Sequence, residues 1–406
     1  MKENKIVKLS DVCDLIPGFA FKSSEFGEHK VKAVKIGDIQ PPYVNFESMT
    51  GVDISKYSVS RLAKYEIFKG DFVLAMTGAT IGKIGRYIAD TGAYINQRVL
   101  KFKPHDEVNS DFIYYVVSST SFQKYILNNV DSETAQPNIS AGSVGKYEFE
   151  LPSLEEQNRI ANILASIDNK IQLNRQINDN LEQQAQALYK SWFVDFEPFK
   201  DGDFVESELG SIPKGWKVVE LGDVTKQITE KVKNRTDVKV LSPVTTGELV
   251  LSEEYFTKQV FSESIAKYIV VKPLQFAYNP ARVNIGSLGM NTFEFDGCVS
   301  PVYVVFECER DYQYFFDYFR KTEAFKEEVL ARAIGGVRQS LSYKDFSLIK
   351  LIYPPRTIVE KFNRLYSNIL VSINHNKVEA NNLTDMRDIL LPKLMSGELK
   401  INEIDC

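Results

Sequence analysis

Two glycine-rich turns carry the side chains of this sequence that are best suited to binding a ligand. The first, Thr77-Gly-Ala-Thr-Ile-Gly-Lys-Ile-Gly-Arg86, offers hydroxyls, backbone N–H groups and cations. The second, Asn279-Pro-Ala-Arg-Val-Asn-Ile-Gly286, contains Arg282 and Asn284, whose side chains can form paired hydrogen bonds with guanine and adenine edges. Both turns therefore favour contacts with a nucleic acid. The alternative is that the glycines only serve the backbone of tight turns between strands.

Further polar side chains occur in three other stretches of the chain, one of which contains Gln136 and Asn138. Lys231 and Lys233 stand close together, and Arg332 and Arg338 flank a Gly-Gly pair. Lysine and arginine suit phosphate contacts that position a protein on a duplex, whereas amides and guanidinium groups can also distinguish bases. A solvated loop is the alternative for each of them. The complete set predicted to contact double-stranded DNA is Thr80, Lys83, Arg86, Gln136, Asn138, Lys231, Lys233, Arg282, Asn284, Arg332, Arg338 and Gln339.

The first turn also imitates a nucleotide-binding loop, but it lacks the chemistry of one. From Gly78 to Lys83 the spacing is one residue shorter than in a P-loop, and Ile84 stands where a serine or threonine would hold magnesium. The second turn begins with Asn279-Pro280, as does the Asn-Pro-Pro-aromatic motif of DNA amino-methyltransferases. Alanine and arginine follow, however, and no glycine-rich turn after a first strand marks an S-adenosylmethionine site.

A third fragment resembles the carboxylate and lysine set of restriction nucleases. It combines Asp388 with Glu398-x-Lys400, but we expect Asp388 to lie in the seam of a long helix and the Glu-x-Lys pair to follow the end of that helix at Pro392. No catalytic residue, metal ligand or cofactor site is therefore predicted in this chain.

Composition excludes several classes of protein. The 406 residues are 44% hydrophobic and 25% charged, which is typical of globular domains. The four cysteines and three histidines are scattered, so neither a zinc site nor a disulfide framework is expected. Because no signal peptide and no apolar run of membrane-spanning length is present, we expect a cytoplasmic protein with no membrane association. The net charge of −5 does not by itself predict DNA binding.

The chain contains the same unit twice. Lys8-Leu-Ser-Asp-Val12 returns as Glu220-Leu-Gly-Asp-Val224, and Ile81-Gly-x-Ile-Gly85 returns as Ile285-Gly-x-Leu-Gly289, at offsets of 212 and 204 residues. Ile139-Ser140 and Leu341-Ser342 follow at an offset of 202. An offset this steady indicates a duplication of whole domains rather than a solenoid repeat.

Each copy has a globular part and a helical part. Short β-branched and aromatic runs such as Phe72-Val-Leu-Ala75 alternate with glycine-rich turns and helical stretches, here expected at Asp111–Leu127 and Tyr312–Leu330, which predicts a mixed α+β domain. A helical period then follows each domain. The expected apolar seam is Ile160, Ile163, Ile167, Ile171, Ile177, Leu181, Leu188 and Trp192 in the first copy, and Phe362, Leu365, Ile369, Ile373, Leu383, Leu390 and Leu394 in the second.

Two helices of this length should pair as a coiled coil. Antiparallel pairing avoids a fully extended connection from Phe193 to Trp216, so we predict a pseudo-twofold α+β fold with two mixed domains separated by the paired helices. Asn174 and Asn376 occupy equivalent seam positions, where a buried asparagine fixes register; the alternative is that the helices curve enough to expose both. The predicted domains are 1–151 and 206–353, and the predicted helical spacers are 152–205 and 354–406. Leu164, Leu173, Val378 and Ile389 are expected on the outer helix faces.

Several of these segments, taken in order, resemble a known family. The first turn, Ile95-Asn-Gln97, Pro137-Asn-Ile-Ser140, Leu151-Pro-Ser-Leu-Glu-Glu-Gln157 and Gly210-Ser-Ile-Pro-Lys-Gly-Trp216 are similar to segments of the specificity subunits of type I restriction-modification systems. The resemblance covers essentially the whole chain. The second copy departs from the pattern, because its turn lacks the Thr-Gly pair and Leu154-Glu-Glu-Gln157 becomes Thr357-Ile-Val-Glu360.

The resemblance implies a non-catalytic protein whose two domains each read half of a bipartite DNA site. It also implies assembly with two modification subunits, which bind S-adenosylmethionine, and with two restriction subunits, which use ATP and magnesium. The alternatives are a single-chain DNA methyltransferase or nuclease, or a fragment of one, and a coiled-coil adaptor with no role on nucleic acid. The missing cofactor motifs count against the first of these alternatives.

Overall fold

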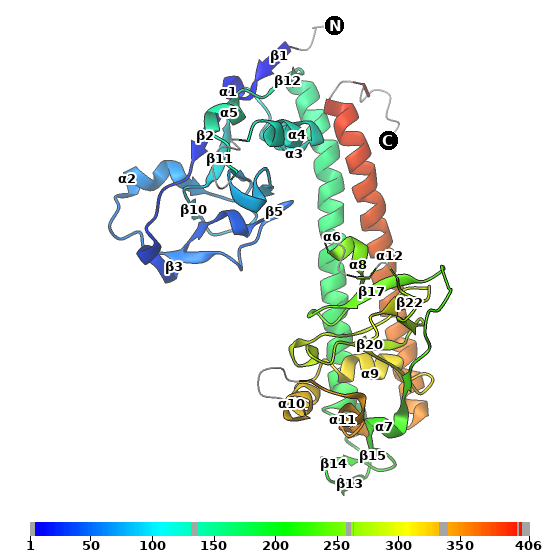
Figure 1. The fold of residues 1–406 in the computed structure, drawn as a ribbon. Helices are drawn as coiled ribbons and strands as arrows, with labels where there is room; N and C mark the ends of the chain where they lie inside the picture. Colours follow the sequence, from blue (N-terminus) through cyan, green and yellow to red (C-terminus); the bar gives the residue numbers. More distant parts are fainter. Residues whose placement is uncertain are drawn as a thin grey trace. The chain divides into compact units, whose positions relative to one another are not determined.

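The protein is described here by a computed structural model that covers residues 5–130, 137–256, 261–262, 264–332, 340–395 and 398–399. The chain forms two compact units (Figure 1). The first consists of Met1–Arg175 with Lys377–Cys406, and the second consists of Gln176–Asn376. Two long helices, α6 (Leu154–Phe193) and α12 (Arg356–Met395), contribute residues to both units.

The first unit contains a mixed domain that is drawn in blue and cyan in Figure 1. Its strands are β1 (Lys5–Lys8), β2 (Cys13–Pro17), β3 (Phe26–Val34), β4 (Ile39–Gln40), β5 (Tyr43–Val44), β6 (Thr50–Val52), β7 (Glu66–Ile67), β8 (Phe72–Ala75), β9 (Ile84–Arg86), β10 (Ala93–Ile95), β11 (Val99–Pro104) and β12 (Glu148–Leu151). They form sheets in the orders β2-β11-β8-β9-β5-β4 and β6-β3-β10-β7, and β1 pairs separately with β12.

The six-stranded sheet is buried on both faces at β8. Phe72 and Leu74 face one apolar cluster, which Phe112 and Phe122 of the helices complete, while Val73 faces a second cluster. Because side chains alternate along a strand, a strand covered on both sides has a continuous apolar sequence. The helices of this unit are α1 (Leu9–Val12), α2 (Val59–Leu62), α3 (Ser110–Ser118), α4 (Thr120–Asn128) and α5 (Ala141–Gly145).

The single helix predicted for Asp111–Leu127 is two helices. The chain leaves helical geometry at Ser119, whose hydroxyl accepts a hydrogen bond of 3.2 Å from the Phe122 backbone N–H. This contact is an N-cap, and it starts α4. The stretch Tyr312–Leu330 is likewise divided between α9 (Gln313–Phe319) and α10 (Glu323–Arg332).

The second unit repeats the topology of the first, which supports the predicted duplication. Its sheets run β16-β23-β20-β21 and β18-β17-β22-β19, matching β2-β11-β8-β9 and β6-β3-β10-β7, and β15 pairs with β24 as β1 pairs with β12. The strands are β13 (Phe204–Ser207), β14 (Gly210–Pro213), β15 (Lys217–Glu220), β16 (Thr225–Ile228), β17 (Lys239–Pro243), β18 (Leu249–Leu251), β19 (Ile269–Val271), β20 (Phe276–Tyr278), β21 (Leu288–Met290), β22 (Gly297–Val299), β23 (Val304–Cys308) and β24 (Lys350–Tyr353), and the further helices are α7 (Leu221–Val224), α8 (Ser252–Tyr255) and α11 (Tyr343–Phe346).

Within each unit the long helices run antiparallel, as predicted. In the first unit Asp168 of α6 pairs with Arg387 of α12 at 3.0 Å, and Asn174, further along α6, donates at 2.6 Å to Glu379, which lies earlier in α12. In the second unit Asn376 donates to Asn178 at 2.9 Å. Asn174 is 1% exposed. The two asparagines predicted at the seam therefore both bond across the helix pair, and the fold is the predicted α+β class.

The apolar seam differs from the prediction at three positions. Leu164, expected on an outer face, is fully buried in the core of the first domain, because α6 packs on that domain as well as on α12. Ile177 and Leu365, expected in the seam, are 38% and 47% exposed. The outer positions that keep their predicted exposure are Leu173, Val378 and Ile389.

The C-terminal end of α12 also corrects two expectations. Pro392 does not end the helix, which continues to Met395. Asp388 is exposed and bonds to the neighbouring Arg387 at 2.8 Å rather than lying in the seam. Among the described helices, none has an apolar stretch of the length that a bilayer crossing requires.

Candidate nucleic-acid interface

The first glycine-rich turn connects β8 to β9 through a short 3-10 helix at Gly78–Thr80. Gly78 and Gly82 have φ values of +73° and +84°, the left-handed region that favours glycine. A Cβ atom on Gly82 would lie 2.9 Å from Oε1 of Gln123. The glycines are thus required by the backbone of the turn. That requirement does not conflict with a binding role for the side chains between and beside them.

The structure brings three segments together at this turn. Residues 137–139 lie antiparallel to it, since Gly78 N–H donates to the Pro137 carbonyl at 3.0 Å and Ile139 N–H donates to the Met76 carbonyl at 3.0 Å. A guanidinium N–H of Arg98, in the loop before β11, lies 3.4 Å from the Thr77 hydroxyl. Asn138, Lys83 and Arg98 all have exposed side chains.

Arg98 was missed by the sequence reasoning. It directly follows the Ile95-Asn-Gln97 segment on which the family resemblance partly rests, so a signal was available. What the sequence did not reveal is that the β10–β11 loop lies next to the turn after β8. That proximity follows from the strand order β2-β11-β8.

Arg86, by contrast, is held inside the first domain. One N–H group of its guanidinium donates to Asp111 at 2.7 Å, and the group lies 4.0 Å from the centroid of the Tyr114 ring. Its side chain is 21% exposed. Lys83 is exposed and forms no ion pair with another described residue. The geometry thus favours Lys83 over Arg86 as a phosphate ligand.

The second turn occupies the same place in the second unit. It connects β20 to β21 through a 3-10 helix at Val283–Ile285 and ends at Gly286, whose φ is +96°. A Cβ atom on Gly286 would lie 2.6 Å from the Thr245 carbonyl oxygen. Leu341 N–H donates to the Pro280 carbonyl at 3.0 Å, as Ile139 does to Met76 in the first unit.

Arg282 and Asn284 differ in exposure. The Arg282 backbone is fixed, because its N–H donates to Asn279 at 2.9 Å and its carbonyl accepts from Ser287 at 3.1 Å, while the side chain is exposed. Asn284 is half-buried. A rigid turn that presents an exposed arginine suits base or phosphate contact, because little conformational freedom is lost when the ligand binds.

A buried ion pair lies against the end of this second turn. Arg320 donates to Asp317 at 2.9 Å and to the carbonyl of Leu288, the first residue of β21, at 2.8 Å. Burial alone raises the pKa of Asp317, but the adjacent charges of Arg320 and Lys321 outweigh it and hold that pKa below its usual value.

The remaining candidate residues fall into three groups. Lys231 and Lys233 are exposed. Thr80 is half-buried and its hydroxyl donates to Thr77 at 3.3 Å, while Arg332 pairs with Glu328 at 2.9 Å, so both have partners within the chain. The candidates outside the described residues are Gln136, Arg338 and Gln339.

Burial suppresses the reactivity of Cys13 and Cys298. Burial raises the pKa of Cys13 to about 12 and that of Cys298 to about 11, so both are protonated at neutral pH. Over the described ranges, no group of three or more histidine, cysteine, aspartate or glutamate side chains is arranged to hold a metal ion.

Comparison with known proteins identifies related chains. Residues 1–183 match the family described as the type I restriction modification DNA specificity domain. The chain is 27% identical to the type I restriction enzyme MjaIX specificity subunit of Methanocaldococcus jannaschii, over 95% of this chain and 97% of that subunit. It is 23% identical to the HindI specificity subunit of Haemophilus influenzae, over 83% and 88% of the two chains.

A solved structure shares the fold. The S subunit of a type I restriction-modification system from M. genitalium aligns with a TM-score of 0.58 over 97% of both chains, at 16% sequence identity. At that identity the match is evidence for the fold alone. It supports the fold class expected from the duplication.

Proposed function

We propose that this chain is a member of the type I restriction-modification DNA specificity family and that its two mixed domains each read one part of a bipartite DNA sequence. We assign the reading domains to residues 1–151 and 206–353 and the helical spacers to 152–205 and 354–406. The observation that carries the proposal is the repeated turn. A rigid glycine-containing loop with exposed recognition-type side chains follows the corresponding strand in both units, after β8 and after β20.

We further propose that this chain supplies recognition while its partners supply the chemistry. The relatives above are named specificity subunits, in agreement with the predicted non-catalytic role. In this scheme two modification subunits bind S-adenosylmethionine and methylate adenine, and two restriction subunits use ATP and magnesium in the cytoplasm. The exposed outer-face residues Leu173, Val378 and Ile389 offer apolar surface for such partners.

Co-expression tests this scheme. The chain should direct methylation to one interrupted DNA sequence when it is produced with the modification subunits of its host, as read by methylome sequencing. The purified chain alone should transfer no methyl group. Methyl transfer by the chain alone would favour the single-chain enzyme alternative. An assembled complex that shows no salt-dependent shift of any DNA would favour the coiled-coil adaptor.

Truncating either exposed turn cation should weaken modification without affecting assembly. If the side chain contacts a base, we expect Arg282→Ala or Lys83→Ala to lose about 1–3 kcal/mol of DNA-binding free energy and to relax specificity at one base pair. A phosphate contact would instead give a uniform loss across sequences and a smaller salt dependence. The measurement is in vitro methylation of the recognised site and its single-base variants by the assembled complex.

Lys69→Ala and Lys217→Ala are suitable controls, since both side chains are exposed and lie outside the two turns. They should leave the methylation rate unchanged. Unaltered rates for both turn variants as well would assign the turns a purely structural role.

A further inference from the structure

The connection between β16 and β17 in the second unit forms an ordered basic loop. Its first half pairs with the edge strand β19 through backbone hydrogen bonds. The Val270 N–H donates to the Glu230 carbonyl at 2.8 Å, and the Val232 N–H donates to the Tyr268 carbonyl at 2.9 Å. Val232 is 1% exposed. Lys231 and Lys233, on either side of this buried residue, are exposed.

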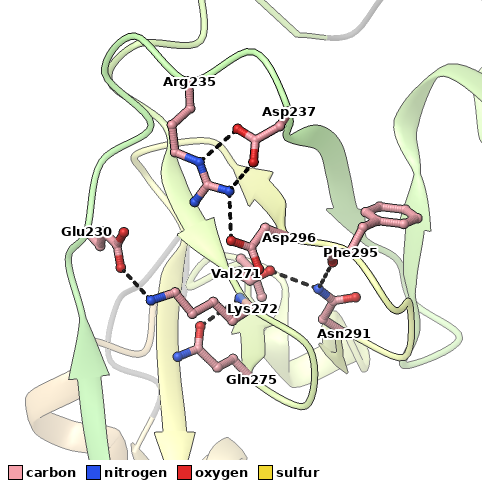
Figure 2. Close-up of polar contacts among 9 residues, drawn as sticks. All are labelled: Glu230, Arg235, Asp237, Val271, Lys272, Gln275, Asn291, Phe295 and Asp296. Carbon is pink, nitrogen blue, oxygen red and sulfur yellow. Dashed lines mark hydrogen bonds and ion pairs between the residues drawn. The ribbon is translucent and has the colours of Figure 1, made fainter.

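Ion pairs occupy the acidic groups around this loop. Figure 2 shows Arg235 between two carboxylates, at 2.6 Å from Asp237 and 2.8 Å from Asp296, and Lys272 beside Glu230 at 3.0 Å. The hydrogen bond with Arg235 lowers the pKa of Asp237, so that group is ionised at neutral pH. Neither Lys231 nor Lys233 forms an ion pair with another described residue.

The far half of the loop is held in one conformation. Lys233 has a φ of +54°, in the left-handed region that a lysine seldom adopts, and its N–H donates to Ala266 at 2.9 Å. Arg235 N–H donates to Val232 at 3.1 Å, and the Arg235 guanidinium fixes the loop to Asp296, just before β22. A hollow lined by Thr229–Arg235 lies within this curve of the chain. Uncommon backbone conformations that are fixed in this way occur often at binding sites.

We propose that Thr229–Asp237 is a phosphate-binding loop for the backbone of double-stranded DNA, in which Lys231 and Lys233 contact phosphates and Arg235 is a positioning residue that does not touch DNA. The inference rests on the proposed function and specifies how the second domain holds its duplex. Two unpaired ammonium groups on a fixed edge segment suit phosphate, because Lys is a point charge that needs no planar partner geometry.

The equivalent loop of the first unit has different chemistry. Between β2 and β3 the chain places Phe19 and Phe21 in an aromatic cluster with Tyr57, and the Tyr57 hydroxyl donates to the carboxylate of Glu25 at 2.9 Å. Apolar packing holds the first-unit loop in place, whereas the ion pairs of Arg235 hold the second-unit loop. The described β2–β3 loop thus has one lysine, Lys22, and lacks the pair of lysines found in the second-unit loop.

Salt dependence of binding tests the lysines. The chain, assembled with its modification subunits, would be titrated onto a random-sequence duplex at several salt concentrations, because phosphate contact does not depend on base sequence. Each of Lys231→Gln and Lys233→Gln should reduce the slope of log K against log salt by about 0.9, and the double variant by about twice that. Lys217→Gln, an exposed lysine on β15, is the matched control and should keep the wild-type slope.

Two substitutions of Arg235 separate positioning from contact. Arg235→Lys keeps a cation that can bind phosphate but cannot bridge Asp237 and Asp296 as a guanidinium does, so it should lose binding as Arg235→Gln does. In the background without the two lysines, Arg235→Gln should change neither affinity nor slope. Wild-type binding by Arg235→Lys would show that the guanidinium bridge does not position the loop. A further slope loss of about 0.9 for Arg235→Gln in that background would show that Arg235 itself contacts DNA.

The outcomes distinguish the loop from the function it serves. If the wild-type complex binds no duplex at any salt concentration, the proposed function fails. If it binds and the lysine variants keep its slope, DNA recognition stands and this loop is not a phosphate contact. Unchanged melting temperatures of the lysine variants show that a changed slope does not come from unfolding.

Discussion

Replacing Arg320 with methionine is expected to lower the free energy of unfolding of the second unit by about 3 kcal/mol at neutral pH, because it leaves a buried carboxylate with one partner instead of two. The side chains of Arg320 and Asp317 are 8% and 10% exposed. Breaking such a pair typically costs about 3–5 kcal/mol. Lys321 still lies 3.0 Å from Asp317 in the variant, which places the expected loss at the lower end of that range.

The loss should shrink as the pH falls. In the wild type the folded-state pKa of Asp317 lies below its usual value, so its contribution to stability is present above an unfolded-state pKa of about 3.9 and disappears as the pH falls through the folded-state value. Without Arg320 only Lys321 opposes the effect of burial, so the pKa of Asp317 should be higher in the variant than in the wild type. Variant and wild type should therefore differ most near pH 7, less at pH 4, and least below the lowered folded-state pKa of wild-type Asp317.

Tryptophan fluorescence can follow this unit selectively. The chain contains two tryptophans, and Trp192 and Trp216 both pack in the apolar core of the second unit. Urea unfolding followed by this signal at pH 7 and pH 4 measures the effect. Lys321→Met is the control, since its side chain is 35% exposed and its loss should cost much less. Equal losses for both variants, or a loss that does not change with pH, would contradict the assignment.

The Arg320→Met substitution should also loosen the second turn. Arg320 also donates to the carbonyl of Leu288, and Gly247 leaves room for its guanidinium, since a Cβ there would lie 2.8 Å from the nearest nitrogen. Removing the donor takes one hydrogen-bond partner from Leu288, the first residue of β21, which follows the turn that carries Arg282. We expect methylation to fall in Arg320→Met even where the protein is fully folded.

The duplication made much of this architecture predictable. A steady offset between matching segments implies matching strand orders. The orders do match, except that β5 and β4 extend the larger sheet of the first unit. The antiparallel helix pair also followed from chain connectivity alone. Continuous apolar runs such as Phe72–Ala75 were correctly predicted as strands, because the sheet is covered on both faces there.

The packing partner of each face of the two long helices was harder to predict from the sequence. An apolar period shows that a helix is partly buried, but it does not say whether another helix or a domain covers it. Leu164 packs against the first domain, whereas Ile177 lies where the seam is filled by the neighbouring Asn178 instead. A search for apolar residues at helical spacing does not detect a polar residue in the seam.

The candidate contact residues show the same limit. Lys83 and Arg86 are close in sequence, but Arg86 shares a strand face with the buried Ile84 and is drawn toward Asp111. The two-residue alternation of β9 contained this information. Arg98 could not be found in this way, because its place beside Thr77 depends on strand order rather than on local pattern.

Exchanging residues 1–151 for the recognition domain of another specificity subunit should replace one half of the DNA site completely and leave the other half unchanged. The backbone supports a junction at this point. Strand β1 pairs with β12 in the register Lys5↔Leu151, so the segment closes on itself just before α6 begins. Because the second unit has its own core, its half of the recognised sequence should survive the exchange.

The exchange should succeed only when the incoming domain fits the helices it meets. The core of the first domain includes Ile160 and Leu164 of α6 and Leu391 and Leu394 of α12. Polar contacts cross the same boundary, since the Tyr115 hydroxyl donates to Asp168 at 2.8 Å. A graft that lacks apolar partners for these leucines leaves cavities, which cost about 2–5 kcal/mol for each large side chain left without contacts.

Two grafts therefore make the experiment decisive. The first carries a foreign domain together with its own helix residues at the positions of Ile160, Leu164 and Asp168, and the second ends at residue 151. Methylome sequencing should show a new half-site for both, with lower methylation for the second. Urea unfolding should show a destabilised first unit in the second graft alone. A graft that changes both half-sites would mean that the two domains read DNA jointly, and equal stability of the grafts would mean that the helices add little to the core of the first domain.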